Sequence, residues 1–187
     1  EDGPLRIVAT TGMVRDLVTN VAGDQAQVTG LMGSGVDPHL YKPTRSDLTA
    51  VLGADAVFYS GLMLEGRMAD AFMQAGRDGV KVYPVTERID ESFLLEPEGF
   101  GGHWDPHVWM DVQAWSQCIK VVTDALSKLD PEHAQQYEAN AEAYRAKLTE
   151  LNQYVQRVIK TVPEESRVLV TAHDAFNYFG RAYGIEV

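Results

Sequence analysis

Short apolar runs alternate with helical patterns through the first half of this chain, and that alternation permits few folds. Between the runs, apolar residues recur at helical spacing, and Gly23 supplies a stop for the first such segment. The runs suited to buried strands are residues 5–10, 26–31, 54–60 and 80–85. An alternation of strands and helices is typical of a parallel sheet covered by helices on both faces. We therefore predict an α/β fold with a four-stranded parallel sheet.

A segment without glycine or proline follows Asp130-Pro131 and continues to about Thr161. Asp130 is expected to cap a helix, with Pro131 at its first position. The apolar side chains of this segment form a one-sided stripe at helical spacing: Tyr137, Tyr144, Leu148, Leu151, Val155 and Val158. About 30 residues at 1.5 Å each give a rod of roughly 45 Å, longer than a small domain is wide. We interpret this rod as a spine helix between two lobes.

Three domains are predicted from these patterns: an α/β lobe over residues 1–129, the spine over 130–162, and the start of a truncated second α/β lobe over 163–187. In the last part, residues 167–171 read as a strand, 175–183 as a helix and 185–187 as the start of another strand. An unfinished lobe exposes apolar surface, expected here at Val168, Val170, Phe176 and Phe179. Self-association of the chain is the expected consequence.

The composition excludes some partners. A net charge of −11 argues against nucleic acid, because phosphate binding needs a basic face. No run approaches the roughly 18 apolar residues of a membrane span. The single cysteine, Cys118, lies in a helical pattern and is interpreted as a buried, inert thiol. One cysteine forms no internal disulfide, so the redox compartment stays open.

Three histidines lie at the ends of separate predicted elements. His39 and His107 share an Asp-Pro-His context, and His173 ends an apolar run and precedes Asp174. Proline stiffens the turn before each imidazole, and a neighbouring carboxylate can orient the ring nitrogen that faces away from a metal. This pattern predicts a transition-metal site with ligands His39, His107 and His173. Neutral imidazoles suit Zn²⁺ best, with Mn²⁺ or iron possible where oxygen ligands complete the shell.

Other interpretations remain open on these residues alone. His39 and His107 can instead be solvated or satisfy a local turn, and His173 can be a core histidine hydrogen-bonded near the sheet. His103 and His133 are predicted to be exposed and not to bind metal. Three histidines and a water also form a catalytic arrangement, so a zinc-dependent hydrolase is an alternative. A metal-independent adhesin or interaction module is another. The sequence has no Gly-x-Ser-x-Gly elbow, Walker loop or His-Glu-x-x-His motif.

The motifs together resemble a known family. They are the segments around Asp37-Pro38-His39, continuing to Asp47, around Asp105-Pro106-His107, continuing to Asp111, and Thr171 to Phe179. In this order they resemble the zinc/manganese solute-binding proteins of ABC transporters, of the TroA type. The resemblance implies an extracytoplasmic receptor, periplasmic or at the cell surface, with two lobes joined by one long helix. It also implies that metal is captured between the lobes and delivered to a membrane permease, without enzymatic activity.

The resemblance assigns the metal ligands to His39, His107 and His173. Manganese-selective members tend to have glutamate at the third position, so His173 favours Zn²⁺ without excluding Mn²⁺. The histidine-rich loop of zinc-dedicated members is reduced here to His103. Family members continue for roughly another hundred residues, where a fourth, aspartate ligand is expected. The chain is accordingly expected to be the amino-terminal portion of such a receptor.

Overall fold

The computed structural model describes residues 3–187, whose first part forms a four-stranded sheet. The strands are β1 (Leu5–Ala9), β2 (Ala26–Gly30), β3 (Ala56–Tyr59) and β4 (Lys81–Pro84). They are all parallel and stand in the order β2-β1-β3-β4. The four runs predicted as strands are therefore confirmed, each within a few residues. The chain reverses its direction of travel across the sheet after β2, so the loops at the carboxyl ends diverge there, as at ligand sites of open α/β sheets.

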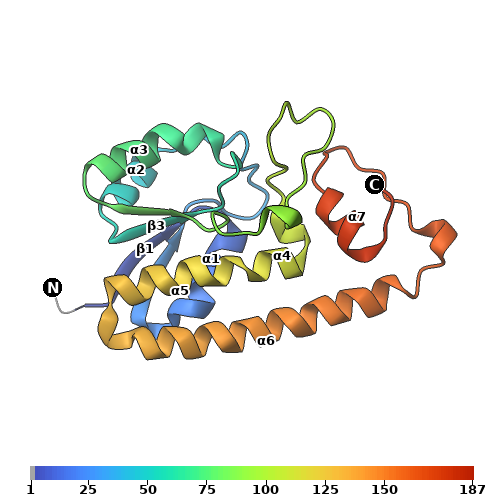
Figure 1. The fold of residues 1–187 in the computed structure, drawn as a ribbon. Helices are drawn as coiled ribbons and strands as arrows, with labels where there is room; N and C mark the ends of the chain where they lie inside the picture. The colour runs from blue at the N-terminus through green and yellow to red at the C-terminus, as the bar shows by residue number, and fades with distance from the viewer. Residues whose placement is uncertain (1–2) are drawn as a thin grey trace.

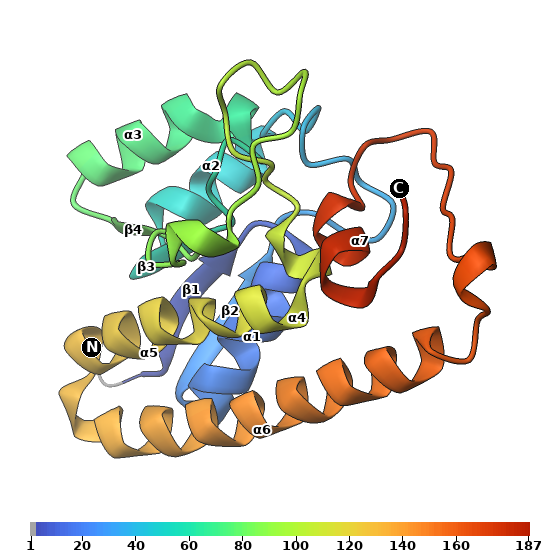
Figure 2. The same cartoon turned by 45° about the vertical axis from the view of Figure 1, so that its right-hand side comes forward.

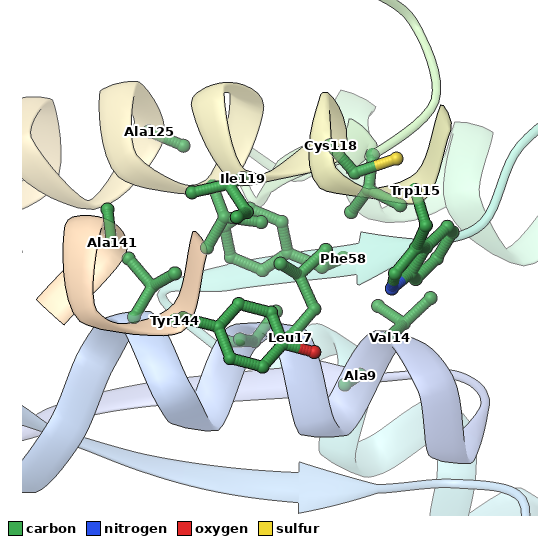
Figure 3. Close-up of a cluster of buried hydrophobic side chains, with 14 of the residues drawn as sticks. Ala9, Val14, Leu17, Phe58, Trp115, Cys118, Ile119, Ala125, Ala141 and Tyr144 are labelled. Atoms are coloured by element: carbon green, nitrogen blue, oxygen red, sulfur yellow. The ribbon is translucent and has the colours of Figure 1, made fainter. Parts of the chain in front are cut away.

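Helices cover both faces of the sheet (Figure 1). On one face lie α1 (Gly12–Ala22) and α5 (Cys118–Leu129), and on the other α2 (Arg45–Leu52) and α3 (Ala69–Arg77). Alternating side chains of one strand serve the two layers, because successive residues of a strand point to opposite faces. In β1, Ile7 and Ala9 join the α1–α5 layer, whereas Val8 joins the α2–α3 layer. Figure 3 shows the first layer, where aromatic and aliphatic side chains fill the space between sheet and helices.

The spine helix is α6 (Ala134–Ile159), which runs from the sheet lobe to the last part of the chain (Figure 1). Its 26 residues make a rod of about 39 Å. Its predicted start is corrected by the structure: residues 131–133 form a 3-10 turn, and Asp130 provides no side-chain cap. The Asp130 carboxylate instead accepts hydrogen bonds from His133 Nδ1 and the Tyr137 hydroxyl, both at 2.7 Å. The Asp130 carboxylate therefore binds the His133 and Tyr137 side chains and does not cap the backbone N–H groups at the helix start.

The apolar stripe of α6 is buried over only half its length. Tyr137, Tyr144 and Leu148 lie in the core beside α1 and α5. Beyond them, Leu151 and Val158 are exposed. The stripe is therefore buried against the sheet lobe from Tyr137 to Leu148 and becomes exposed beyond that point.

One predicted helix is interrupted. Residues 112–129 form α4 (Val112–Ser116) and α5, separated by Gln117. Asp111 begins α4, because its carboxylate accepts hydrogen bonds from the backbone N–H groups of Gln113 and Ala114. Short 3-10 turns complete the chain: Gly23–Gln25, Gly66–Met68, Glu91–Phe93, Val108–Met110, Pro131–His133 and Glu164–Ser166.

The predicted strand at residues 167–171 is wrong. Only one isolated parallel bridge, between Val168 and Glu186, forms in this part of the chain. Only two backbone hydrogen bonds close this bridge, from the Leu169 N–H to the Glu186 carbonyl and from the Glu186 N–H to the Arg167 carbonyl, and they make too short a ladder for a strand. The helix expected nearby is present as α7 (Asn177–Tyr183) and lies beside α4 in both views (Figures 1 and 2).

The exposure expected in this last part is found at Val168 (57% exposed) and Val170 (91% exposed). It is not found in full at Phe176 and Phe179, which are half-buried. Phe179 packs edge-on against Tyr183 within α7, and this contact removes part of its surface from water. Among the described residues, no helix combines the length and apolar character needed to cross a membrane.

Candidate metal centre

His39 lies in the loop between β2 and α2, held by a turn of its own motif. The Asp37 carboxylate accepts a hydrogen bond from the His39 backbone N–H at 2.9 Å, the geometry of an Asx turn. The far end of this loop is anchored at α2. There Thr44 and Asp47 form a capping box at the start of α2, and the Tyr41 hydroxyl donates to Asp47 at 2.7 Å. These contacts fix both sides of the loop around the half-buried imidazole.

His107 lies at the end of the long connection between β4 and α4 and is buried. The Asp105 carboxylate accepts from the His107 backbone N–H at 2.9 Å, which repeats the turn at Asp37. The same oxygen, Oδ1, also lies 2.6 Å from His107 Nδ1. This second contact places the ring proton on Nδ1 and directs the Nε2 lone pair away from Asp105.

His173 comes from the segment between α6 and α7 and is exposed. The Thr171 hydroxyl donates to the His173 backbone carbonyl at 2.8 Å, closing a short turn around the histidine. His173 follows no regular strand, although the sequence predicted one. A local turn holds its position instead.

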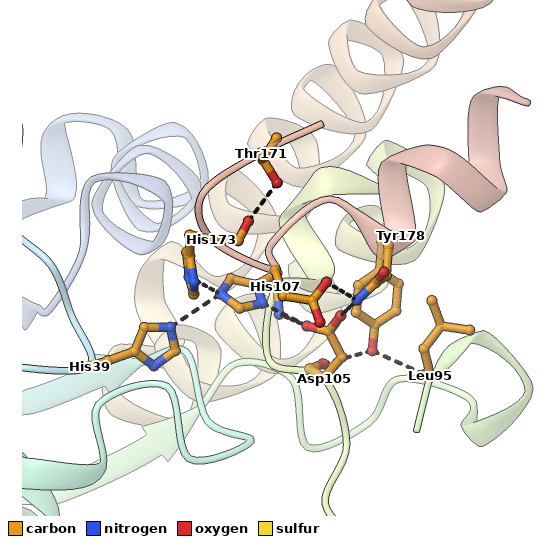
Figure 4. Close-up of polar contacts among 9 residues, drawn as sticks. His39, Leu95, Asp105, His107, Thr171, His173 and Tyr178 are labelled. Atoms are coloured by element: carbon orange, nitrogen blue, oxygen red, sulfur yellow. Dashed lines mark hydrogen bonds and ion pairs between the residues drawn. The ribbon is translucent and has the colours of Figure 1, made fainter. Parts of the chain in front are cut away.

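The three imidazoles converge on one point from three separate loops (Figure 4). His107 Nε2 lies 3.1 Å from His39 Nε2 and 3.2 Å from His173 Nε2. One candidate ligand atom from each ring lies within 4.8 Å of the others. The rings stand edge to face, so their nitrogens meet while their faces do not stack. The fold thus brings together all three histidines that the sequence predicts as ligands.

Asp105 connects this cluster to the rest of the molecule. Its backbone N–H donates to the Leu95 carbonyl at 2.7 Å, and its carbonyl accepts from the Tyr178 hydroxyl at 2.7 Å. The Leu95 backbone N–H donates to the same hydroxyl at 3.1 Å. The long loop at residues 86–106 is therefore tied to α7 beside the histidines.

The surroundings favour a neutral imidazole at His39 and an ionised carboxylate at Asp105. Burial, followed by the neighbouring His107, lowers the pKa of His39 from its usual value. For Asp105, burial raises the pKa, but hydrogen bonds from His107 and Asn177 outweigh it, and the net pKa lies below the usual range. Imidazole must be neutral to bind a metal, so these environments preserve donor capacity.

The other histidines stay outside this cluster. His103 is exposed in the loop before His107, as predicted. His133 is half-buried rather than fully solvated, because its Nδ1 pairs with Asp130. The Cys118 thiol is fully buried in the core, as predicted, and burial raises its pKa.

Sequence reasoning did not find the residues that support the cluster from α7. Asn177 and Tyr178 both contact Asp105, across more than 70 positions of the chain. No local signal identifies such a partner, because an asparagine or tyrosine at a helix start has many ordinary roles. The nearest hint was their position within the Thr171–Phe179 segment that carries the family resemblance, which assigned them no role.

A family model described as zinc-uptake complex component A, periplasmic, matches residues 7–187 of the chain. The manganese-binding lipoprotein MntA of Bacillus subtilis (strain 168) is 42% identical over 186 residues, which cover 100% of this chain and 60% of MntA. The zinc-binding protein TroA of Treponema pallidum (strain Nichols) is 44% identical over 186 residues, covering 100% of this chain and 59% of TroA. The solved structure of the periplasmic zinc binding protein TroA from Treponema pallidum matches with a TM-score of 0.93 and 43% identity, over 98% of this chain and 65% of that one. The chain spans about 60% of the length of these curated relatives.

Proposed function

The chain belongs to the family described as zinc-uptake complex component A, periplasmic, and on that premise we propose that it captures Zn²⁺ or Mn²⁺ for an ABC transporter. In this proposal the chain is the amino-terminal portion of an extracytoplasmic substrate-binding component, and the metal is its cargo. The ligands from this chain are His39, His107 and His173. The lobe, spine and second-lobe division at residues 1–129, 130–162 and 163–187 belongs to the same proposal.

The observation that carries the proposal is the convergence of three imidazole nitrogens on one point. The His107 proton sits on Nδ1, which donates to Asp105, so Nε2 is the unprotonated ring nitrogen and carries a single lone pair. One lone pair does not accept two good hydrogen bonds, yet two other Nε2 atoms lie 3.1 and 3.2 Å away. A shared cation satisfies all three lone pairs at once. Nitrogens at the 2.0–2.1 Å of a tetrahedral zinc site stand about 3.3 Å apart, which is close to these separations.

The ligand set favours zinc over manganese. Three imidazole nitrogens suit Zn²⁺, whereas Mn²⁺ prefers a larger share of oxygen ligands. The carboxylates within the two Asp-Pro-His motifs already accept hydrogen bonds, Asp37 from the His39 backbone N–H and Asp105 from His107 Nδ1. We infer that Zn²⁺ binds this portion more tightly than Mn²⁺.

Binding without turnover is the expected behaviour. The matching family is described as a component of a zinc-uptake complex and not as an enzyme. A hydrolytic zinc site of this kind is expected to have a general base near the bound water, and the Asp105 carboxylate already accepts from His107 and Asn177. Zinc-loaded protein should therefore hydrolyse esters and peptides no faster than its His107→Ala variant.

The proposal is tested by calorimetric titration of demetallated protein with Zn²⁺ and with Mn²⁺. We expect one Zn²⁺ per chain, and a loss of affinity above about 100-fold for each of His39→Ala, His107→Ala and His173→Ala, because each change removes a ligand rather than a group that orients one. His103→Ala is the matched control, since this exposed histidine lies four residues before His107, outside the cluster. Equal effects of the control and the ligand variants would refute the site.

Delivery to a membrane permease is the second part of the proposal. Cells that lack the gene should accumulate less zinc at low external zinc, and the natural gene should restore uptake. A gene carrying His107→Ala should not restore it. Restoration by this variant would separate uptake from the histidine cluster.

Self-association is proposed on the exposed apolar side chains at the end of α6 and in the last part of the chain. They are Leu151, Tyr154, Val158, Val168 and Val170. Apolar surface of this kind favours association. Sedimentation should show a mass that rises with protein concentration, and a smaller rise for the double variant Val168→Ser, Val170→Ser. A monomer at every concentration would contradict the proposal.

A further inference from the structure

Asn177 links two of the three histidine-bearing segments through its side-chain amide. It is the first residue of α7 and lies four positions after His173. Its Nδ2 donates to Asp105 Oδ2 at 3.0 Å and to Asp174 Oδ1 at 3.1 Å. One amide group therefore connects the residue next to His173 with the carboxylate that orients His107.

The two carboxylate oxygens of Asp105 contact different residues. Oδ1 holds His107 through its backbone N–H and its Nδ1, whereas Oδ2 faces Asn177. Figure 4 shows Asp105 and His107 in line with His173, with dashed contacts running through this carboxylate. Because a carboxylate is planar, a donor at Oδ2 restricts its rotation and so fixes the direction in which Oδ1 presents the imidazole.

We propose that Asn177 is a positioning residue, which sets the direction of His107 and the distance between His107 and His173 by holding Asp105 and Asp174 together. The inference rests on the proposed metal capture and adds a residue that selects its geometry. Asn177 does not touch the point where the three nitrogens meet. It acts through the two aspartates alone.

The neighbouring Tyr178 also contacts Asp105, but it contributes to the hydrophobic core as well. Its ring is fully buried in the core, and its hydroxyl contacts the Asp105 backbone. Its loss removes packing and a hydrogen bond together, so a Tyr178 variant tests folding as much as the site. Asn177 is half-buried outside the core. Truncation there removes the bridge and leaves the packing of α7 in place.

The experiment compares Asn177→Ala with Asn152→Ala. Asn152 is a matched control, because it is also half-buried and its side chain accepts a hydrogen bond from Tyr183 of α7 at 3.0 Å instead of donating to Asp105. We expect Asn177→Ala to raise the zinc dissociation constant roughly tenfold, the lower end for residues that orient metal ligands. Asn152→Ala should change it less than about twofold. Circular dichroism and thermal unfolding establish that both variants are folded.

A second readout uses the metal-free protein and does not depend on zinc binding. Nitrogen-15 spectra of the imidazoles report which ring nitrogen of His107 carries the proton and how His173 is oriented. Asn177→Ala should broaden or shift the His107 and His173 signals and leave His133 unchanged, while Asn152→Ala should move none of them.

The outcomes separate the two proposals. If the unmodified chain binds no zinc, metal capture by this chain fails, and the imidazole spectra still decide the role of Asn177. If zinc binds and Asn177→Ala changes neither the affinity nor the spectra, the positioning role is overturned and metal capture stands. Equal changes in the Asn177 and Asn152 variants would also overturn it, because they would reflect a general loosening of α7.

Discussion

Asp37 and Asp105 each begin an Asp-Pro-His motif but form different contacts, and single substitutions can test this difference. Asp37 only accepts from the His39 backbone N–H, whereas Asp105 also accepts from His107 Nδ1 and from Asn177. Asp105→Asn removes the charge that orients the imidazole and should weaken zinc binding by about 10- to 100-fold. Asp37→Asn should weaken it less than about threefold, since an amide oxygen still accepts from a backbone N–H. Calorimetry on the two variants measures both, and equal losses would contradict the assignment.

Protonation gives the second prediction at this scale. Each imidazole must be neutral to bind, so protons compete with zinc as the pH falls through about 6.5. Burial and the proximity of His107 lower the pKa of His39, so His39 keeps its donor capacity to a lower pH than an ordinary histidine. The zinc dissociation constant should be nearly flat from pH 8 to 7 and should rise steeply between about pH 6.5 and 5. A constant affinity from pH 8 to pH 5 would exclude a site of three histidines.

The sequence predicted the three converging histidines because their motifs are local: the turn chemistry of Asp-Pro-His is contained in three residues. That they bind metal stays a prediction. Asn177 and Tyr178 escaped prediction because their role depends on contacts with Asp105 that only tertiary folding creates. Turn chemistry within a short motif can therefore be predicted from the sequence, whereas a polar partner that is distant in the sequence cannot.

Elements were predictable where one segment carries its own signal. The four strands are examples, since composition and spacing decide them locally. The strand expected at residues 167–171 failed, because a strand is defined by its partners and only Val168 and Glu186 pair there. The prediction that Asp130 caps α6 is wrong for a related reason. The Asp130 carboxylate accepts hydrogen bonds from the His133 and Tyr137 side chains instead of from the backbone at the helix start.

The spine helix supplies a prediction at the scale of elements. Leu148 and Leu151 lie on the same apolar stripe, yet Leu148 is 7% exposed and Leu151 is 44% exposed. Leu148→Ala opens a cavity beside the core and should lower the free energy of unfolding by about 2–5 kcal/mol. Leu151→Ala should lower it by less than about 1 kcal/mol, because little surface is lost from the interior. Urea denaturation of both variants measures these values, and equal losses would mean that the second half of α6 is also covered in solution.

At the scale of the whole molecule, the histidines come from loops far apart in the chain, so a bound metal should cross-link parts that otherwise open independently. His173 reaches the cluster from the segment before α7, whereas His39 and His107 belong to the sheet lobe. Zinc at 100 times its dissociation constant stabilises the bound state by about 2.7 kcal/mol, or roughly 100-fold in exchange of amides whose opening breaks the site. Hydrogen exchange in α7 should slow towards this limit when zinc is added. Amides of α3 that exchange by local opening should not change, because α3 packs in the separate layer on the other face of the sheet. If zinc binds while exchange in α7 stays the same, His173 is not a ligand in solution, and His39 and His107 hold the metal without the last part of the chain.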